Sequence, residues 1–311
     1  MQNQISTSPG RASGGAAGLV GAHEPAAAQR HSVLTAFGRP RNPLNNRFVY
    51  AVISQRAHGL SIGVNLNPDK RCNFDCVYCE VNRDDPGQES RVDIGAMSVE
   101  LERMLDLVQA NKLRELPWFR HLPAELLALK EVALSGDGEP TLCPNFHDVV
   151  REVAYLRSRG TVPFFKIVLI TNASGLDSPD TMRGLRLLAV EDEVWVKLDA
   201  GTQEHMDRVN NADVPLWKIL GNILLIGRQR HIVIQSLFPL VNGEEPSADD
   251  IAQYVQRLLQ LKNAGAQIDM VQVYSAHRPP HRPNCEHLAL KALSAIARRV
   301  REKTGLKAQV F

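Results

Sequence analysis

The chain has 311 residues, of which 44% are hydrophobic and 23% are charged, as is usual for a globular protein. Its formal net charge of +2 gives no strong argument for a nucleic-acid partner and does not exclude one. No apolar run reaches the roughly 18 residues of a membrane span. Few cysteines, clustered locally, suit a reducing cytoplasm rather than a secreted disulfide framework.

Residues 1–30 are rich in Gly, Ala, Ser and Gln and have little periodicity, which predicts a disordered segment. They lack the long apolar centre of a signal peptide. A transit peptide is the alternative, but Glu24 and the weak arginine content favour disorder. We expect residues 47–311 to form the folded domain.

From residue 47 onward, short apolar runs alternate with helical patterns. The runs predict strands at 47–54 (or an edge extension there), 60–66, 131–135, 165–170, 193–198, 232–238, 268–274 and 308–311. Helices are expected to begin at Ser98, Asn145, Ser178, 214, Ser247 and 287, with Asn145, Ser178 and Ser247 as caps. Alternating strands and helices imply a parallel sheet with right-handed crossovers. The fold class is therefore α/β, a partial (β/α)6 TIM-like barrel.

Three cysteines, Cys72, Cys76 and Cys79, follow the strand predicted at 60–66. A [4Fe–4S] cube normally takes four cysteine ligands, so a set of three leaves one iron open to bind another molecule. A zinc site needs a fourth ligand, and neither Cys143 nor Cys285 stands at a knuckle spacing. We interpret the three cysteines as an iron–sulfur site, with zinc as the alternative.

Polar residues stand where the predicted strands end, which is where ligands bind in barrels of this type. The turn Gly136-Asp137-Gly138-Glu139-Pro140 has two glycines, which allow close approach to a ligand and positive φ. A plain strand-to-helix turn is the alternative. Further polar positions at strand ends are Asn172, Lys197, Asp199, Gln235 and Tyr274.

The spacing Cys-x3-Cys-x-aromatic-Cys, with Tyr78 before the last cysteine, resembles the radical S-adenosylmethionine (radical SAM) superfamily. The resemblance implies that SAM chelates the open iron and that an electron from the reduced cluster splits its sulfonium C–S bond. The resulting 5′-deoxyadenosyl radical would abstract hydrogen from a substrate. A reductase, flavodoxin or ferredoxin is implied as the electron donor.

The turn Gly136–Pro140 resembles the Gly-Gly-Glu-Pro motif that holds the amino group of SAM, with Asp137 at the second glycine position. By the same resemblance, Tyr78 lies against the adenine. Asn172 is placed to bind the ribose or carboxylate of SAM, or else serves as a turn residue. Gln235 either touches SAM or faces a neighbouring helix.

Lys197 and Asp199 are the candidate catalytic residues. They form an internal ion pair at the barrel mouth, or Lys197 acts as a Schiff-base or proton-transfer group. Cys143 and Cys285 are expected to be buried rather than ligands, and two cysteines are too few for a second three-cysteine cluster site.

The basic, proline-rich loop 277–283 predicts an anionic substrate, such as a nucleotide, RNA or a carboxylate. The basic residues of the last helix are read as a solvated face, with an RNA-binding stripe as the alternative. Several segments, among them 63–68 and 234–238, resemble the wyosine-type tRNA-modifying branch of the superfamily, whose second cluster needs cysteines that this chain lacks. Rival functions are an activase that makes a glycyl radical on a partner protein and a zinc or iron–sulfur binding module without turnover.

Overall fold

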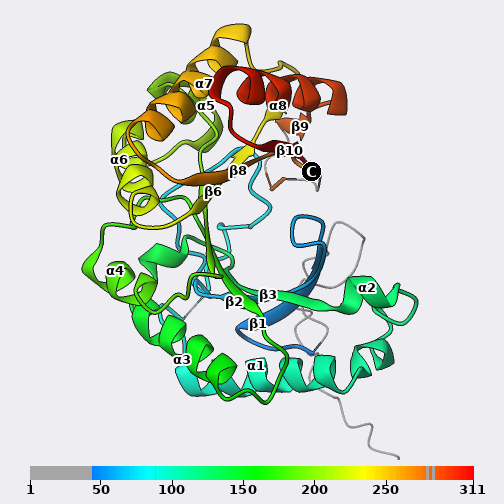
Figure 1. The fold of residues 1–311 in the computed structure, drawn as a ribbon. Helices are drawn as coiled ribbons and strands as arrows, with labels where there is room; N and C mark the ends of the chain where they lie inside the picture. The colour runs from blue at the N-terminus through cyan, green and yellow to red at the C-terminus, as the bar shows by residue number, and fades with distance from the viewer. Residues whose placement is uncertain (1–43, 88, 278–279, 282–283) are drawn as a thin grey trace, which may run out of the picture. The chain divides into compact units, whose positions relative to one another are not determined.

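A curved, mostly parallel sheet is the centre of the structure, a computed structural model that describes residues 44–87, 89–277, 280–281 and 284–311 (Figure 1). All of these residues belong to one unit, Ser32–Phe311. In the described part of the chain the sheet has eight strands in the order β1-β2-β3-β4-β5-β6-β8-β10. Their bounds are Val49–Ser54 (β1), Gly59–Asn65 (β2), Leu129–Ser135 (β3), Lys166–Thr171 (β4), Glu193–Lys197 (β5), Ile232–Leu237 (β6), Ile268–Tyr274 (β8) and Ala308–Val310 (β10).

The pairing of the strands confirms the predicted α/β partial barrel. Every neighbouring pair from β2 to β10 is parallel, whereas β1 pairs with β2 in the antiparallel direction through a tight hairpin. The first predicted strand is therefore the edge extension of the barrel. The carboxyl ends of the parallel strands meet at one end of the sheet, and the polar residues singled out in the sequence gather there.

Helices lie along the outer side of the sheet (Figure 1). They are α1 (Ile94–Gln109), α3 (Phe146–Ser158), α4 (Pro179–Leu185), α5 (Gln203–Asn210), α6 (Leu216–Gly227), α7 (Ala248–Asn263) and α8 (Leu290–Thr304), with shorter elements η1 (Lys112–Glu115), α2 (Ala124–Leu127) and η2 (Pro140–Leu142) between them. The apolar face of α7, with Ile251, Val255 and Leu258, is buried in the main core. Each such side chain contributes about 1.5–3 kcal/mol when fully buried.

Ser178 and Ser247 cap α4 and α7 as predicted, because their hydroxyls accept the N–H groups of Thr181 and Asp250. The predicted start of the first helix at Ser98 is wrong. The helix begins at Ile94, where the Asp93 carboxylate accepts the N–H of Ala96.

Asn145 precedes α3, but its side chain does not cap that helix. Its amide instead exchanges hydrogen bonds with the backbone of Val92, at 2.9 and 3.3 Å, so it joins two segments far apart in the sequence. The last helix begins at Leu290, not at 287. His287 belongs to β9 (Cys285–His287), which pairs with β7 (Pro239–Val241) in a separate two-stranded sheet.

The prediction for residues 1–30 lies outside the described residues. Among the helices of the described ranges, none has the length and hydropathy that crossing a membrane requires.

Candidate functional site

The three clustered cysteines line one cavity of about 650 Å³ at the carboxyl ends of the parallel strands. The opposite walls come from the ends of β3, β4, β5 and β8. The cavity therefore brings together most of the residues predicted from the sequence: Cys72, Cys76, Cys79, Tyr78, Gly136, Asp137, Gly138, Glu139, Asn172 and Lys197.

The cysteine loop is held by backbone pairing with the end of α5 and the residues that follow it. The N–H of Asp75 donates to the carbonyl of Asn210 at 3.0 Å, and the N–H of Val77 donates to Val209 at 3.0 Å. Phe74 also forms an isolated bridge with Ala212. These contacts fix the loop in register, so the positions of its thiols depend on a segment more than a hundred residues away.

Each of the three thiols accepts a hydrogen bond. The donors are the backbone N–H of Phe74 to Cys72 (3.4 Å), the Asn210 side-chain amide to Cys76 (3.4 Å) and the Arg83 guanidinium to Cys79 (3.1 Å). Donors aimed at sulfur stabilise the thiolate form that binds metal and tune the potential of a bound cluster.

Burial dominates the ionisation of two of these thiols. It raises the pKa of Cys72 to about 12, with a further contribution from Glu139, and it raises the pKa of Cys76 to about 11. Both thiols are protonated at neutral pH in the metal-free protein, so binding of a metal group must release protons.

Within the described ranges, no three or more His, Cys, Asp or Glu side chains are grouped to hold a single metal ion. A cube-shaped cluster sets a different requirement, because each thiolate binds an iron of its own. All five cysteines are free thiols, and Cys143 and Cys285 are buried as predicted.

The Gly136–Pro140 turn packs directly against the cysteine loop. The N–H of Glu139 donates to the carbonyl of Arg71 at 3.0 Å, and a Cβ at Gly138 would lie 2.0 Å from that same carbonyl oxygen. Gly136 has φ of +146°, and a Cβ there would lie 2.0 Å from Oδ1 of Asn65. Both glycines are thus required by close packing of the protein on itself.

Asp137 and Glu139 are held by protein donors. Asn65 donates its side-chain amide to Asp137 at 2.8 Å. The buried carboxylate of Glu139 accepts the backbone N–H and the hydroxyl of Thr141, the hydroxyl of Thr171 and the backbone N–H of Asn172. Glu139 therefore ties the turn to the end of β4.

Asn172 links the end of β4 to the cysteine loop. Its side-chain amide donates to Oδ1 of Asn73 at 2.9 Å, and Ser174 donates its hydroxyl to the same oxygen at 3.1 Å. Asn73 lies between Cys72 and Cys76, so this contact fixes the loop from its second side.

Lys197, Asp199 and Tyr78 form a buried network. The Lys197 Nζ lies 3.9 Å from Oδ2 of Asp199, which confirms the ion pair predicted for these residues. The hydroxyl of Tyr78 donates to Asp199, and Asn210 donates to the same carboxylate at 2.8 Å. Lys197 Nζ also donates to the hydroxyl of Tyr274 at 3.0 Å.

The charge of Lys197 follows from these contacts. Burial alone lowers the pKa of this amine, but the negative charge of Asp199 and the contact with Tyr274 outweigh it and raise the pKa. Lys197, whose side chain is 18% exposed, is therefore a cation at neutral pH.

Gln235 is buried on β6 and donates to Gln272 of β8 at 2.9 Å. It faces a neighbouring strand rather than a helix and lies outside the walls of the cavity. Sequence reasoning missed two residues that touch the cysteines, Asn210 and Arg83. Arg83 stands only four residues after Cys79, which is a local signal, whereas Asn210 is brought in by tertiary structure alone.

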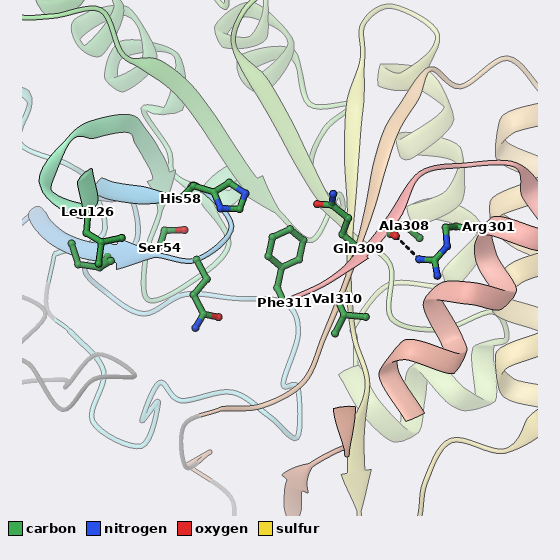
Figure 2. A pocket seen from close by; sticks show the side chains of 10 residues that line it. Ser54, His58, Leu126, Arg301, Ala308, Gln309, Val310 and Phe311 are labelled. Atoms are coloured by element: carbon green, nitrogen blue, oxygen red, sulfur yellow. Dashed lines mark hydrogen bonds between the residues drawn. The ribbon is translucent and has the colours of Figure 1, made fainter. Parts of the chain in front are cut away.

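A second cavity, of about 770 Å³, lies between the β1–β2 hairpin and β10 (Figure 2). Phe311 and His58 approach each other across it, with ring centres 6.3 Å apart. Ser54, Gln55 and Phe311 belong to the walls of both cavities, so the two cavities adjoin at the hairpin.

Comparison with known proteins assigns the family. The family model described as "Radical SAM superfamily" matches residues 66–255. The chain belongs to the radical SAM superfamily. It is also similar to a UPF0026 protein of Helicobacter pylori, with 24% identity over 242 residues that cover 76% of this chain and 70% of that protein. A UPF0026 protein of Synechocystis is 28% identical over 56% of this chain and 57% of its own length.

Solved structures support the same fold. The structure of TYW1 with a lysine–pyruvate adduct bound has a TM-score of 0.50 and 20% identity, over 81% of this chain and 75% of that one. A radical SAM methyltransferase from Sphaerobacter thermophilus has a TM-score of 0.57 and 13% identity, over 85% and 68% of the two chains. At sequence identities this low, the structural similarity shows a shared barrel fold.

Membership of the superfamily makes this protein an enzyme whose cofactors are a [4Fe–4S] cluster and SAM, with reductive cleavage of SAM as its general chemistry. Enzymes of this kind need an electron donor and a substrate. The cavity fits the two cofactors, because three free thiols line it together with a polar turn and buried hydrogen-bonding groups.

Proposed function

We propose that Cys72, Cys76 and Cys79 hold the cluster and that residues 47–311 act as one radical SAM domain on an anionic substrate. The observation that carries this proposal is the shared cavity, which is lined by all three thiols, by the turn from Gly136 to Glu139 and by Lys197. A metal module without turnover has no need of such a cavity.

When bound, the cluster and SAM supply a 5′-deoxyadenosyl radical through reductive cleavage. The protein's own residues position the cofactors and the substrate. The turn Gly136–Glu139, Asn172 and Tyr78 are the proposed binding groups for SAM. Gln235, which the sequence also suggested, lies outside the walls of the cavity and is not included. Glu139 and Asn172 hold that part of the cavity in shape through their bonds to Thr171 and Asn73.

Lys197 and Asp199 are the proposed groups at the substrate. Asp199 is buried, with its side chain 1% exposed, and Lys197 can hold a proton at Nζ in a cavity partly closed to water. The backbone N–H of His281 donates to the carbonyl of Cys79 at 2.8 Å, so this residue lies beside the cysteine loop. An anionic substrate is favoured by this arrangement.

The test is anaerobic reconstitution with iron and sulfide, reduction with dithionite, addition of SAM, and detection of 5′-deoxyadenosine by mass spectrometry. We expect product from the wild-type protein and none from Cys76→Ala. The matched control is Cys143→Ala, which removes a buried thiol outside the cavity and keeps both iron and product.

Iron content is measured on the same samples. A wild-type protein that binds zinc and takes up no iron contradicts the proposal. Equal 5′-deoxyadenosine from wild type and Cys76→Ala contradicts the assignment of the ligands.

A further inference from the structure

Arg56 is a cation inside the cavity that the proposed chemistry does not use. It lies in the turn between β1 and β2, at the opposite end of β2 from the cysteine loop, and its side chain lines the cavity. Its guanidinium carbon lies 4.8 Å from the centre of the Tyr274 ring and 6.0 Å from the centre of the Trp195 ring. Among the described residues, no carboxylate or other acceptor lies within ion-pair or hydrogen-bond distance of it.

Lys197 meets the same tyrosine. Its Nζ donates to the Tyr274 hydroxyl at 3.0 Å and lies 5.4 Å from the centre of the ring. Arg56 and Lys197 therefore converge on one aromatic side chain, from two different elements of the fold. Aromatic faces can hold cations without neutralising them, which leaves the N–H groups free to bind a ligand.

The acidic groups in contact with these cations do not balance them. Asp199 is 3.9 Å from Lys197 and already accepts hydrogen bonds from Tyr78, Asn210 and the N–H of Leu237. Glu131 lines the same cavity and accepts the hydroxyl of Ser61 at 2.9 Å. Burial raises the pKa of Glu131, while the positive charges of Lys166 and Arg56 act in the opposite direction.

Among the described residues, Arg56 has no carboxylate within ion-pair distance, and Lys197 has Asp199 at 3.9 Å. Charge that is removed from water without a partner is costly, and a bound anion relieves that cost. The planar guanidinium fork matches the two oxygens of a carboxylate or phosphate.

We propose that Arg56 and Lys197 form one binding site for an oxyanion group of the substrate, a carboxylate or a phosphate. The site anchors the substrate on the hairpin side of the cavity, so the rest of the molecule extends toward the cysteine loop. Gln55, the neighbour of Arg56, also lines the second cavity between the hairpin and β10 (Figure 2), so the proposed site lies beside that cavity. This inference rests on the proposed function, because it takes the cysteine-lined cavity as the substrate site.

The test is chemical footprinting of arginine with phenylglyoxal on the full-length, anaerobically purified protein. The rate of modification of Arg56 is read by mass spectrometry in chloride, in acetate and in inorganic phosphate at equal ionic strength. Arg186 is the matched control, an exposed arginine that lies outside both cavities.

We expect acetate or phosphate to slow modification of Arg56 about tenfold at roughly ten times its dissociation constant, by simple mass action, and to leave Arg186 unchanged. The more protective anion identifies the oxyanion. Lys197→Met should abolish most of the protection, and Lys197→Arg should keep it because the charge is retained.

Unchanged modification of Arg56 in both oxyanions overturns the proposal, as does equal protection of Arg186. Full protection in a folded Lys197→Met protein overturns the two-cation site. The modification rate of Arg56 does not depend on SAM cleavage. If the protein makes no 5′-deoxyadenosine, the proposed function is refuted, but the modification rates still test whether Arg56 and Lys197 bind an oxyanion.

Discussion

Arg83 should set the reduction potential of the cluster. Its Nη1 donates to the sulfur of Cys79 at 3.1 Å, and its Nε donates to the carbonyl of Lys70 at 3.3 Å, which holds the guanidinium in place. A reduced cluster carries one more negative charge than an oxidised one. A cation that donates to a ligand sulfur therefore stabilises the reduced state more, and its removal should lower the potential.

The size of the shift follows from that one contact. A hydrogen bond to a charged group contributes about 1.5–3 kcal/mol, and we assign roughly 1 kcal/mol of it to the difference between the two redox states. For a one-electron couple, 59 mV corresponds to about 1.4 kcal/mol, so Arg83→Met should lower the midpoint potential by about 40 mV. Arg83→Lys keeps the charge and should shift it by less.

The assay is a redox titration of the reconstituted protein, followed by electron paramagnetic resonance of the reduced cluster. Arg186→Met serves as the control for loss of an arginine far from the cysteines and should leave the potential unchanged. A fully loaded Arg83→Met protein whose potential stays within about 10 mV of wild type would refute the reasoning, since that corresponds to only about 0.2 kcal/mol.

Three further changes test the framework of the site. Gly138→Ala places a Cβ 2.0 Å from the Arg71 carbonyl oxygen and should reduce iron loading severalfold. The control is Gly221→Ala, whose Cβ meets nothing within 4 Å. This variant should bind iron fully and gain about 0.5–1 kcal/mol in stability. Glu139→Gln places an amide among four hydrogen-bond donors. The expected loss of about 2–3 kcal/mol should lower the melting temperature of the metal-free protein by about 3–5 °C in calorimetry. Burial lowers the pKa of His205 in the folded protein below 6.5. As the pH falls below 6.5, the unfolded chain therefore binds the proton more readily than the folded one, and the free energy of unfolding should decrease. Urea titrations should show that this free energy depends less on pH in His205→Gln than in the wild-type protein.

The strands could be predicted from the sequence because parallel strands buried on both faces read as continuous apolar runs. Leu60, Ile62 and Val64 of β2 are all fully buried, and no other element type fits so short a run. The cysteine motif was equally accessible, since its three thiols lie within one loop. The short helix α5 was missed because its eight residues are mostly polar and form little more than two turns.

The supports of the site could not be predicted, because they come from distant segments. Asn210 reaches Cys76 only after α5 and the loop that follows it pair with the cysteine loop. The error at Asn145 has the same origin. A residue type suited to capping was used instead for a long-range bond to Val92, and local propensity carries no information about such a partner.

The two roles open to Lys197 in the sequence can be compared on physical grounds. A Schiff base needs a neutral amine, and a lysine becomes neutral near pH 7 only where burial or a neighbouring cation lowers its pKa. Burial acts in that direction here, but Asp199 and Tyr274 act against it and raise the pKa above its ordinary value. Very little neutral amine is then present at pH 7. The geometry therefore favours Lys197 as a fixed positive charge, held by the ion pair with Asp199 and the bond to Tyr274. Arg56 lies against the same tyrosine ring, so two positive charges meet there, as the proposed binding of an oxyanion requires.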